Sequence, residues 1–385
     1  MSHFWFAGKG KGSIPAVASW RGIAAFLIFI FHFWGFFLQG ESSKKIGWGI
    51  FDFTPFFKAG HVALDFFFVL SGLLLFVSIS RKSFGAKSLA PVFKSFLNKR
   101  FVRLWPLAAF FTVLIFLLRG PDFFLSRIGW ANLLAHLTFT QSFFQQTYWG
   151  LNPVMWTLTV EMLFILVLPL VIFAGRNSRR TFLQILLALC VANFLFRAFV
   201  FQFFENLLPL EKVFFSEQLW GRFDQFALGI LLGVFFAAGG QEKFARKKNL
   251  QIFARVALFA GFVGMTLLIA FFARVGSNFR DSIFLQTFLH FFVALAFTIF
   301  LFGFACAGNF PGKDLLAPKG FALFGRVSFS FFLWHFPVLS FFHKMHIAPW
   351  PAFVGSFLVS LALSLVTAFL IENLLAAKML QKRKT

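Results

Sequence analysis

Long apolar stretches alternate with short polar connections along the whole chain. A helix needs about 20 apolar residues to cross the hydrocarbon core of a bilayer. Segments of roughly this length recur ten times, at residues 15–39, 61–80, 102–119, 154–174, 181–201, 219–237, 252–273, 284–307, 324–343 and 351–373. The pattern predicts an all-α polytopic membrane protein with about ten transmembrane helices.

Segment 130–148 is ambiguous, because it is partly apolar but contains Asn132, His136 and three Gln. If it does not cross, the loops on the N-terminal side hold 21 Lys or Arg and the opposite loops hold 8. The positive-inside rule then predicts cytoplasmic N- and C-termini. Residues 120–153 become an outer loop that dips into the membrane or lies along it.

Domain organisation follows from the absence of a Pro, Gly or Ser-rich linker between the apolar segments. We expect residues 15–375 to form a single transmembrane domain, preceded by a cytoplasmic segment, 1–14, and followed by a basic cytoplasmic tail, 376–385. The first apolar run is longer than a signal-peptide core and has no small-residue cleavage site, so it is predicted to be a retained helix.

Composition supports the membrane class, since 59% of the residues are hydrophobic and only 13% are charged. The net charge of +23 does not indicate nucleic-acid binding, because Lys and Arg lie between apolar segments and form no single basic stripe. This distribution favours membrane topology and contact with anionic lipids. The 70 Phe and single Tyr leave few ring hydroxyls for hydrogen bonding. Cys190 and Cys306 indicate neither a disulfide framework nor a metal cluster.

Ionisable residues inside a membrane span are costly, so each is a candidate for function. Arg21 and His32 lie eleven residues apart in the first span. In a helix this spacing returns to nearly the same face about 16 Å along the axis. The pair predicts a polar stripe, although a snorkelling Arg and an unrelated structural His explain the same spacing.

Asp65 precedes a long apolar stretch in the second span and needs a partner or a proton there. A structural bond to another helix is the alternative to a catalytic role. Arg100 and Arg103, just before the third span, are three residues apart and therefore share a helix face. Such a pair can grip phosphate oxygens, although ordinary positive-inside topology also explains it.

The remaining spans contribute isolated candidates. Glu161 lies early in the fourth span, where burial keeps it neutral or an Arg keeps it charged. Arg222 and Asp224 open the sixth span and are interpreted as offsetting each other's charge. Ser328 and His335 in the ninth span are seven residues apart, on one helix face. Each of these residues taken alone is more often structural than catalytic.

Six strings along the chain together resemble the acyltransferase 3 family of membrane acyltransferases. They are WRGIAAFLIFIFHF, DFFFVLSGLLLF, RFVRLWPL, WTLTVEMLF, RFDQFALG and FGRVSFSFFLWHFPV. They occur in the family's order and extend over about residues 15 to 375. Each string is weakly specific because it is so apolar, whereas the ordered series is specific. The resemblance covers the membrane domain only, and we expect no appended extracytoplasmic hydrolase-like domain.

The resemblance implies transfer of an acyl group, most often acetyl from acetyl-CoA, to a hydroxyl of a glycan, glycolipid or related acceptor. Acyl-CoA is then a co-substrate, and we expect no tightly bound cofactor and no metal. The expected partners are acyl-CoA, a hydroxyl-bearing glycan or lipid-linked acceptor, and membrane lipids, with no nucleic acid. The expected location is the bacterial cytoplasmic membrane.

Within this hypothesis His32 acts as the general base on the acceptor hydroxyl, because a neutral imidazole accepts protons near pH 7. Arg100 and Arg103 hold the CoA phosphates. Arg21 holds the CoA tail or stabilises the developing oxyanion, and either Glu161 or Asp65 orients the imidazole. The candidate substrate-binding residues lie in the same strings and are Trp156, Arg222, His335 and Ser328.

The chain departs from the family where Phe replaces a usual Tyr, as in SFSFFLWHF and MLFILVLP. Direct transfer is preferred to a covalent acyl intermediate on His32 or Ser71, because no G-x-S-x-G motif is present. A transporter or flippase that uses the buried charges as a substrate path is the main alternative. A membrane scaffold in which those charges are packing pairs is the third.

Overall fold

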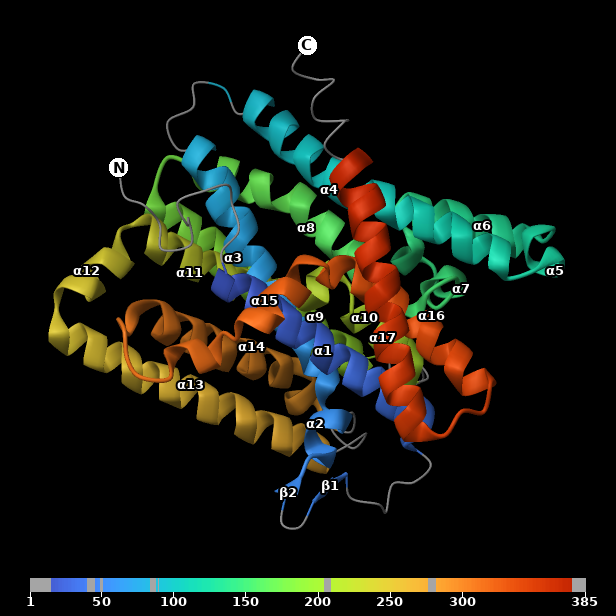
Figure 1. The fold of residues 1–385 in the computed structure, drawn as a ribbon. Coiled ribbons are helices and arrows are strands. Elements are labelled where there is room, and N and C mark those ends of the chain that lie inside the picture. The colour runs from blue at the N-terminus through green and yellow to red at the C-terminus, as the bar shows by residue number, and fades with distance from the viewer. Residues whose placement is uncertain are drawn as a thin grey trace. The chain divides into compact units, whose positions relative to one another are not determined.

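The computed structural model describes residues 15–39, 46–48, 51–83, 88, 90–203, 209–275 and 282–375. The predicted cytoplasmic segment 1–14 and basic tail 376–385 lie outside the described residues. Helices dominate the described part (Figure 1). The protein is an all-α polytopic membrane protein, as the apolar pattern predicts.

Within the described ranges, nine helices are long and apolar enough to cross a membrane. They correspond to α1 (Pro15–Phe37), α3 (Ala63–Ser83), α4 (Ala90–Leu118), α8 (Trp156–Gly175), α9 (Arg179–Phe203), α11 (Leu219–Ala237), α13 (Lys248–Val275), α14 (Ile283–Cys306) and α17 (Pro349–Thr367). A tenth candidate is bent by 74° between η6 (Lys313–Leu316) with α15 (Lys319–Arg326) and α16 (Ser328–Lys344). The bend falls in the span predicted at 324–343, so part of that segment belongs to α15.

The remaining elements are short. A two-stranded antiparallel sheet pairs β1 (Gly47–Trp48) with β2 (Phe51–Asp52). The other helical elements are α2 (Thr54–Lys58), η2 (Gly60–Val62), α5 (Pro121–Phe124), α6 (Arg127–Leu137), η3 (Gln141–Phe143), α7 (Gln145–Tyr148), η4 (Pro153–Met155), α10 (Pro209–Ser216), α12 (Gly240–Arg246) and the π-helical η7 (Ala368–Leu375). Segment 130–148 thus breaks into pieces too short to cross a bilayer.

Two helix starts show why the chain forms helices where it does. Ser282 precedes α14, and its side chain accepts a hydrogen bond from the Leu285 backbone N–H at 3.3 Å. Ser126 caps α6 in the same way, accepting from Gly129 N–H at 2.9 Å. Each cap satisfies a backbone donor that the first helical turn leaves unpaired, which matters most where water is scarce.

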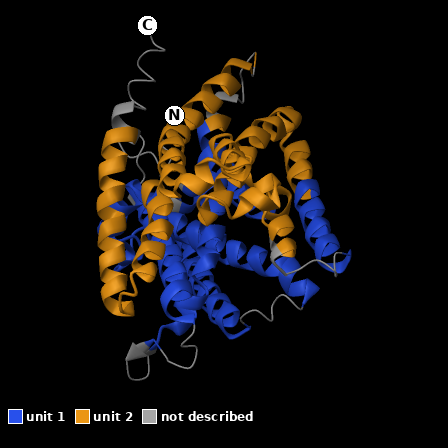
Figure 2. Ribbon diagram, turned by 90° about the vertical axis from the view of Figure 1, so that its right-hand side faces the viewer, with its two compact units in different colours: residues 1–78, 188–205, 223–328 blue, residues 79–187, 206–222, 329–385 orange. Residues whose placement is uncertain are grey.

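The chain divides into two compact units, drawn in two colours in Figure 2. Unit 1 contains residues 1–78, 188–205 and 223–328. Its helices approach closely through paired glycines. A Cβ added to Gly22 of α1 would lie 2.2 Å from the Phe321 carbonyl oxygen of α15, and one added to Gly325 would lie 1.8 Å from the Ala18 oxygen. Only glycine permits this separation of the two backbones.

The same reciprocal arrangement recurs at two further crossings in unit 1. Gly72 of α3 and Gly229 of α11 face each other's helix, as do Gly261 of α13 and Gly303 of α14. At each of these positions the nearest backbone atom would stand 2.1 to 2.4 Å from an added Cβ. Small residues are the usual means of helix packing in lipid, where no hydrophobic force drives helices together.

Unit 2 contains residues 79–187, 206–222 and 329–385. Its apolar core includes Phe111, Met155, Leu158 and Leu333, all at most 3% exposed. Helix α6 packs against α4, where the Trp105 indole N–H donates to the Leu137 carbonyl at 3.0 Å. The contact holds α6 against α4, and with 11 residues α6 is too short to cross a bilayer on its own.

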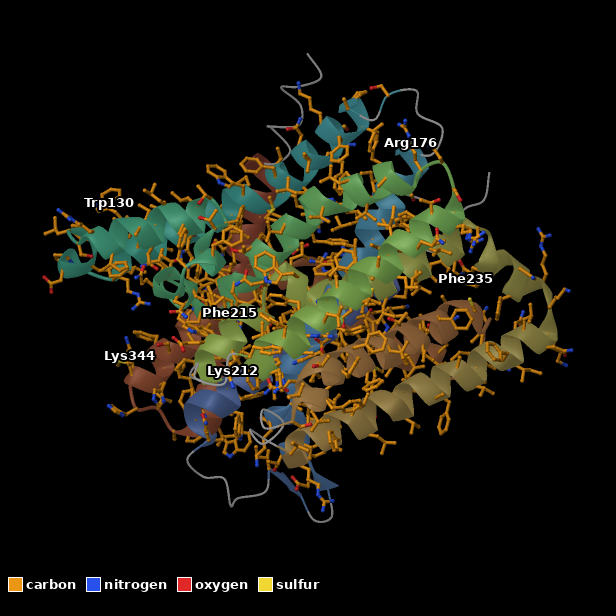
Figure 3. All side chains as sticks on the ribbon, turned by 180° about the vertical axis from the view of Figure 1, so that it is seen from behind. Trp130, Arg176, Lys212, Phe215, Phe235 and Lys344 are labelled. Atoms are coloured by element: carbon orange, nitrogen blue, oxygen red, sulfur yellow. The ribbon has the colours of Figure 1, made fainter. Side chains whose placement is uncertain are left out.

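Helix α4 begins at Ala90, twelve residues before the predicted start of the third span, and continues through Pro106. The polar sequence NKRFVR is therefore helical, a continuation that hydropathy alone does not reveal. Many large apolar side chains are exposed on helices of both units, which suits contact with lipid. Trp130 on α6, labelled in Figure 3, is 53% exposed.

Candidate active site

Helix α1 carries two of the predicted site residues in unit 1. The helix is continuous from Pro15 to Phe37, so Arg21 and His32 retain the helical spacing on which the predicted polar stripe depends. Both side chains are half-buried. The His32 ring packs at 5.2 Å, edge to face, against the neighbouring Phe31.

A cluster of ionisable residues lies beside Phe31 in the same unit. The His61 ring, from η2, stands 5.2 Å from Phe31 and 6.0 Å from the ring of His290. His290, in α14, donates its Nδ1–H to Asp65, with Nδ1 lying 2.9 Å from Oδ2 and 3.2 Å from Oδ1. We call His61, Asp65 and His290 the imidazole–carboxylate cluster. Asp65 therefore has an imidazole partner, as a carboxylate in a membrane span requires.

Asp224 has a different partner from the one expected. Its Oδ2 accepts a hydrogen bond at 2.8 Å from Nη2 of Arg197 in α9, and both side chains are at most 2% exposed. The Arg197 guanidinium also lies 5.3 Å from the Phe194 ring centroid. Arg222 instead makes a two-pronged ion pair with Glu217, including Nε to Oε2 at 2.8 Å. The two charges expected to offset each other are each neutralised by another residue.

The arginine pair lies within α4 in unit 2. Arg100 is half-buried, with its guanidinium 5.6 Å from the Phe96 ring centroid, whereas Arg103 is exposed. Glu161 of α8 is half-buried and attracts Arg100 electrostatically, while Arg103 repels it. Glu161 is thus associated with the arginine pair. An exposed guanidinium next to a partly neutralised one retains net positive charge, which suits an anionic ligand.

Trp156 opens α8 and is 7% exposed. It stacks at a centroid distance of 6.3 Å on Tyr148, the single tyrosine of the chain. Tyr148 also feels the charges of Glu217 and Arg222, and burial, reinforced by Glu217, raises the pKa of its phenol well above the usual value. Two candidate substrate-binding residues, Trp156 and Arg222, therefore share Tyr148 as a neighbour.

Ser328 and His335 are both 1% exposed and make local hydrogen bonds. The Ser328 hydroxyl donates to the Gly325 carbonyl at 2.9 Å, and His335 Nδ1–H donates to the Phe331 carbonyl at 3.2 Å. These bonds satisfy polar groups within their own segments, and they fix the His335 tautomer with Nε2 as its acceptor nitrogen.

Sequence reasoning missed several residues of these clusters. His290 and Arg197 lie in predicted spans, so the rule that picked out His32 also applies to them. Glu217 and His61 lie at span boundaries, where sequence does not distinguish a buried charge from a solvated one. Tyr148 was signalled only by its rarity.

Comparison with known proteins gives one result. A protein-family model described as an acyltransferase domain matches residues 14–369. Neither a curated protein nor a solved structure matches the chain.

Proposed function

Because the chain belongs to the acyltransferase 3 family, and is an integral membrane acyltransferase, we propose that it moves an acetyl or related acyl group from acyl-CoA to a hydroxyl. The proposed acceptor is a glycan, glycolipid or lipid-linked sugar of the cell envelope. The proposed location is the bacterial cytoplasmic membrane, with both termini in the cytoplasm on the side that supplies acyl-CoA.

The observation that carries the proposal is the half-buried imidazole of His32 in a continuous spanning helix that also carries Arg21. In the proposed reaction the acceptor oxygen attacks the thioester carbonyl, a C–O bond forms and the C–S bond breaks. His32 accepts the hydroxyl proton, and CoA leaves as its thiolate. Arg21 stabilises the negative charge that develops on the carbonyl oxygen or holds the CoA tail.

Arg100 and Arg103 are proposed to bind the CoA phosphates. The exposed side chain of Arg103 supports this role, since a ligand can reach it. Glu161 is proposed to position Arg100, which it attracts, and Asp65 to support the imidazole chemistry. Trp156 and Arg222 are proposed to contact the acceptor, and Ser328 and His335 to shape its site.

The test uses purified full-length protein in detergent, acetyl-CoA labelled in its acetyl group, and an extract of bacterial envelope glycans and lipids. Label that appears on a component of the extract supports the enzyme. With the protein reconstituted in vesicles, movement of an extract component across the vesicle membrane without label transfer would instead support a transporter. The absence of both label transfer and movement would support a scaffold. His32→Ala is expected to abolish label transfer while the protein remains in the membrane, and retained turnover would overturn the base assignment.

The donor assignment has its own test. Arg103→Ala is expected to raise the KM for acetyl-CoA with little change in kcat, because the interaction is made equally in the ground and transition states. Arg176→Ala, at an exposed arginine on α8's C-terminal side that Figure 3 labels, is the matched control. An unchanged KM in Arg103→Ala would indicate that Arg103 serves membrane topology and does not bind the donor.

A further inference from the structure

The imidazole–carboxylate cluster lies in unit 1 and combines three ionisable side chains from separate parts of the sequence. His61 comes from η2, Asp65 from the first turn of α3, and His290 from α14. Asp65 is 1% exposed and His290 13% exposed. The His290 side chain is therefore the more exposed member of a pair whose carboxylate is buried.

Aromatic rings hold the cluster in place. Phe272 of α13 packs against His61 at 5.1 Å and against His290 at 5.4 Å. Phe31 of α1 also packs against His61, at 5.2 Å. Gly60 fixes η2 against α1, since a Cβ there would stand 2.3 Å from the Leu27 carbonyl oxygen. The rings and the close backbone contact restrict how His61 and His290 can turn.

The hydrogen bond to Asp65 also fixes the tautomer of His290. A carboxylate accepts from Nδ1–H, which leaves Nε2 as the basic nitrogen of the neutral ring. When that nitrogen gains a proton, the new positive charge stands beside a negative one. In a membrane interior an isolated imidazolium is costly, whereas one paired with a carboxylate is much less so.

On this basis, and resting on the function proposed above, we propose that Asp65 and His290 form the proton-holding pair of the acyltransferase. The acceptor hydroxyl gives its proton to His32 as the C–O bond forms and the C–S bond breaks. The proton then passes to Nε2 of His290, where Asp65 compensates its charge. Solvent protonates the departing CoA thiolate, and His290 returns its proton to solvent, so the protons balance over one turnover.

The groups that face this pair come from several elements. His61 of η2 approaches the His290 ring from one side, and Phe272 of α13 covers another. His32 lies on α1 next to Phe31, whose ring contacts His61. Asp65 is therefore a positioning residue that acts through His290, and His61 contacts both Phe31 of α1 and the His290 ring.

The primary experiment measures kcat and the KM for acetyl-CoA in His290→Gln over a range of pH. Glutamine can still donate a hydrogen bond to Asp65 but cannot accept a proton at neutral pH. We expect kcat to fall about 100-fold, as for loss of a general acid–base group, with an unchanged KM. The pH dependence of kcat should flatten between about pH 5 and 8, where histidine titrates.

Three further variants separate proton transfer from structure. His290→Ala should regain turnover when free imidazole is added, a response that a purely structural role does not give. Asp65→Asn should keep the fold-stabilising contact but lower kcat and alter its pH profile. His61→Phe preserves a ring at that position, so a loss of kcat there assigns His61 to the proton path.

Exposed His343, on α16, provides the matched control, and His343→Gln should behave as wild type. If wild type and this control transfer the acetyl group but His290→Gln keeps their kcat and pH profile, the proton-holding role is wrong while the proposed function stands. If wild-type protein itself fails to label the envelope extract, the proposed function fails first.

Discussion

Replacing Asp224 by Asn is expected to destabilise the protein by about 3 to 5 kcal/mol, the usual cost of breaking a buried ion pair by removing one partner. Asp224 is 0% exposed and Arg197 2% exposed, with 2.8 Å between Nη2 and Oδ2. Asn retains the shape and one hydrogen-bond acceptor. The buried guanidinium of Arg197 then loses the carboxylate charge that lies 2.8 Å away, which is the source of the cost.

The double variant Arg197→Met with Asp224→Leu removes both charges and retains most of the side-chain volume. Its stability should lie near that of wild type or exceed it by up to about 4 kcal/mol, since the desolvation of both ions is avoided. The single variants Arg197→Met and Asp224→Leu, together with this double variant and wild type, form a thermodynamic cycle. Its coupling energy reports the interaction between the two residues.

Equilibrium unfolding of the purified protein in mixed micelles, followed by the exposure of tryptophan, supplies the free energies. Arg176→Met is the control for removing an arginine, because Arg176, labelled in Figure 3, is exposed. Its guanidinium lies 4.7 Å from the Phe173 ring centroid. Its expected cost is about 0.5 to 1 kcal/mol. If Asp224→Asn costs no more than this control, or if the single effects simply add, the pair is not the buried unit that we describe.

Three more outcomes follow from local geometry. Gly22→Ala should lower stability measurably because its Cβ meets a backbone oxygen at 2.2 Å, whereas Gly35→Ala on the same helix has open space and should be neutral in the same unfolding assay. Burial lowers the pKa of His136 from 6.5 to about 4, so the unfolded chain binds a proton at this histidine before the folded chain does. Stability should therefore fall as the pH drops from 6.5 towards 4, by about 2 kcal/mol at pH 5, and His136→Gln should remove this pH dependence. Tyr148→Phe should change stability by less than about 1 kcal/mol, since the buried hydroxyl has no hydrogen-bond partner in the described part of the chain; a larger loss would contradict that geometry.

Hydropathy predicts the helices well because each span is apolar over its full length, and a bilayer imposes that length. It misplaces the start of α4, since the helix continues through the polar residues around Arg100 that hydropathy assigns to a loop. It also cannot foresee the 74° bend before α16. That bend allows α15 to lie against α1 through Gly325, a tertiary contact without a local signal.

Sequence reasoning picks out several ionisable residues of the spans, Asp65 and Asp224 among them, but not the residues with which they pair. An ionisable residue in an apolar span indicates that a partner is needed, but that partner can come from any other span. Asp224 lies two residues from Arg222 in sequence and instead pairs with Arg197, 27 residues away. Asp65 pairs with His290, 225 residues away. Sequence separation of this size carries no information about which helices meet.

The scarcity of tyrosine explains why so few residues carry the polar chemistry. Phe packs as well as Tyr in lipid but donates no hydrogen bond. Ring hydrogen bonds between distant segments therefore fall to indoles, as in Trp105 to Leu137 and Trp334 to Thr367, and to imidazoles such as His290. Elsewhere the helices meet through glycine, where backbone contact replaces side-chain hydrogen bonding. In such a chain a paired imidazole is among the few groups that can hold a proton. For this reason the proposed proton-holding pair is sought in the imidazole–carboxylate cluster.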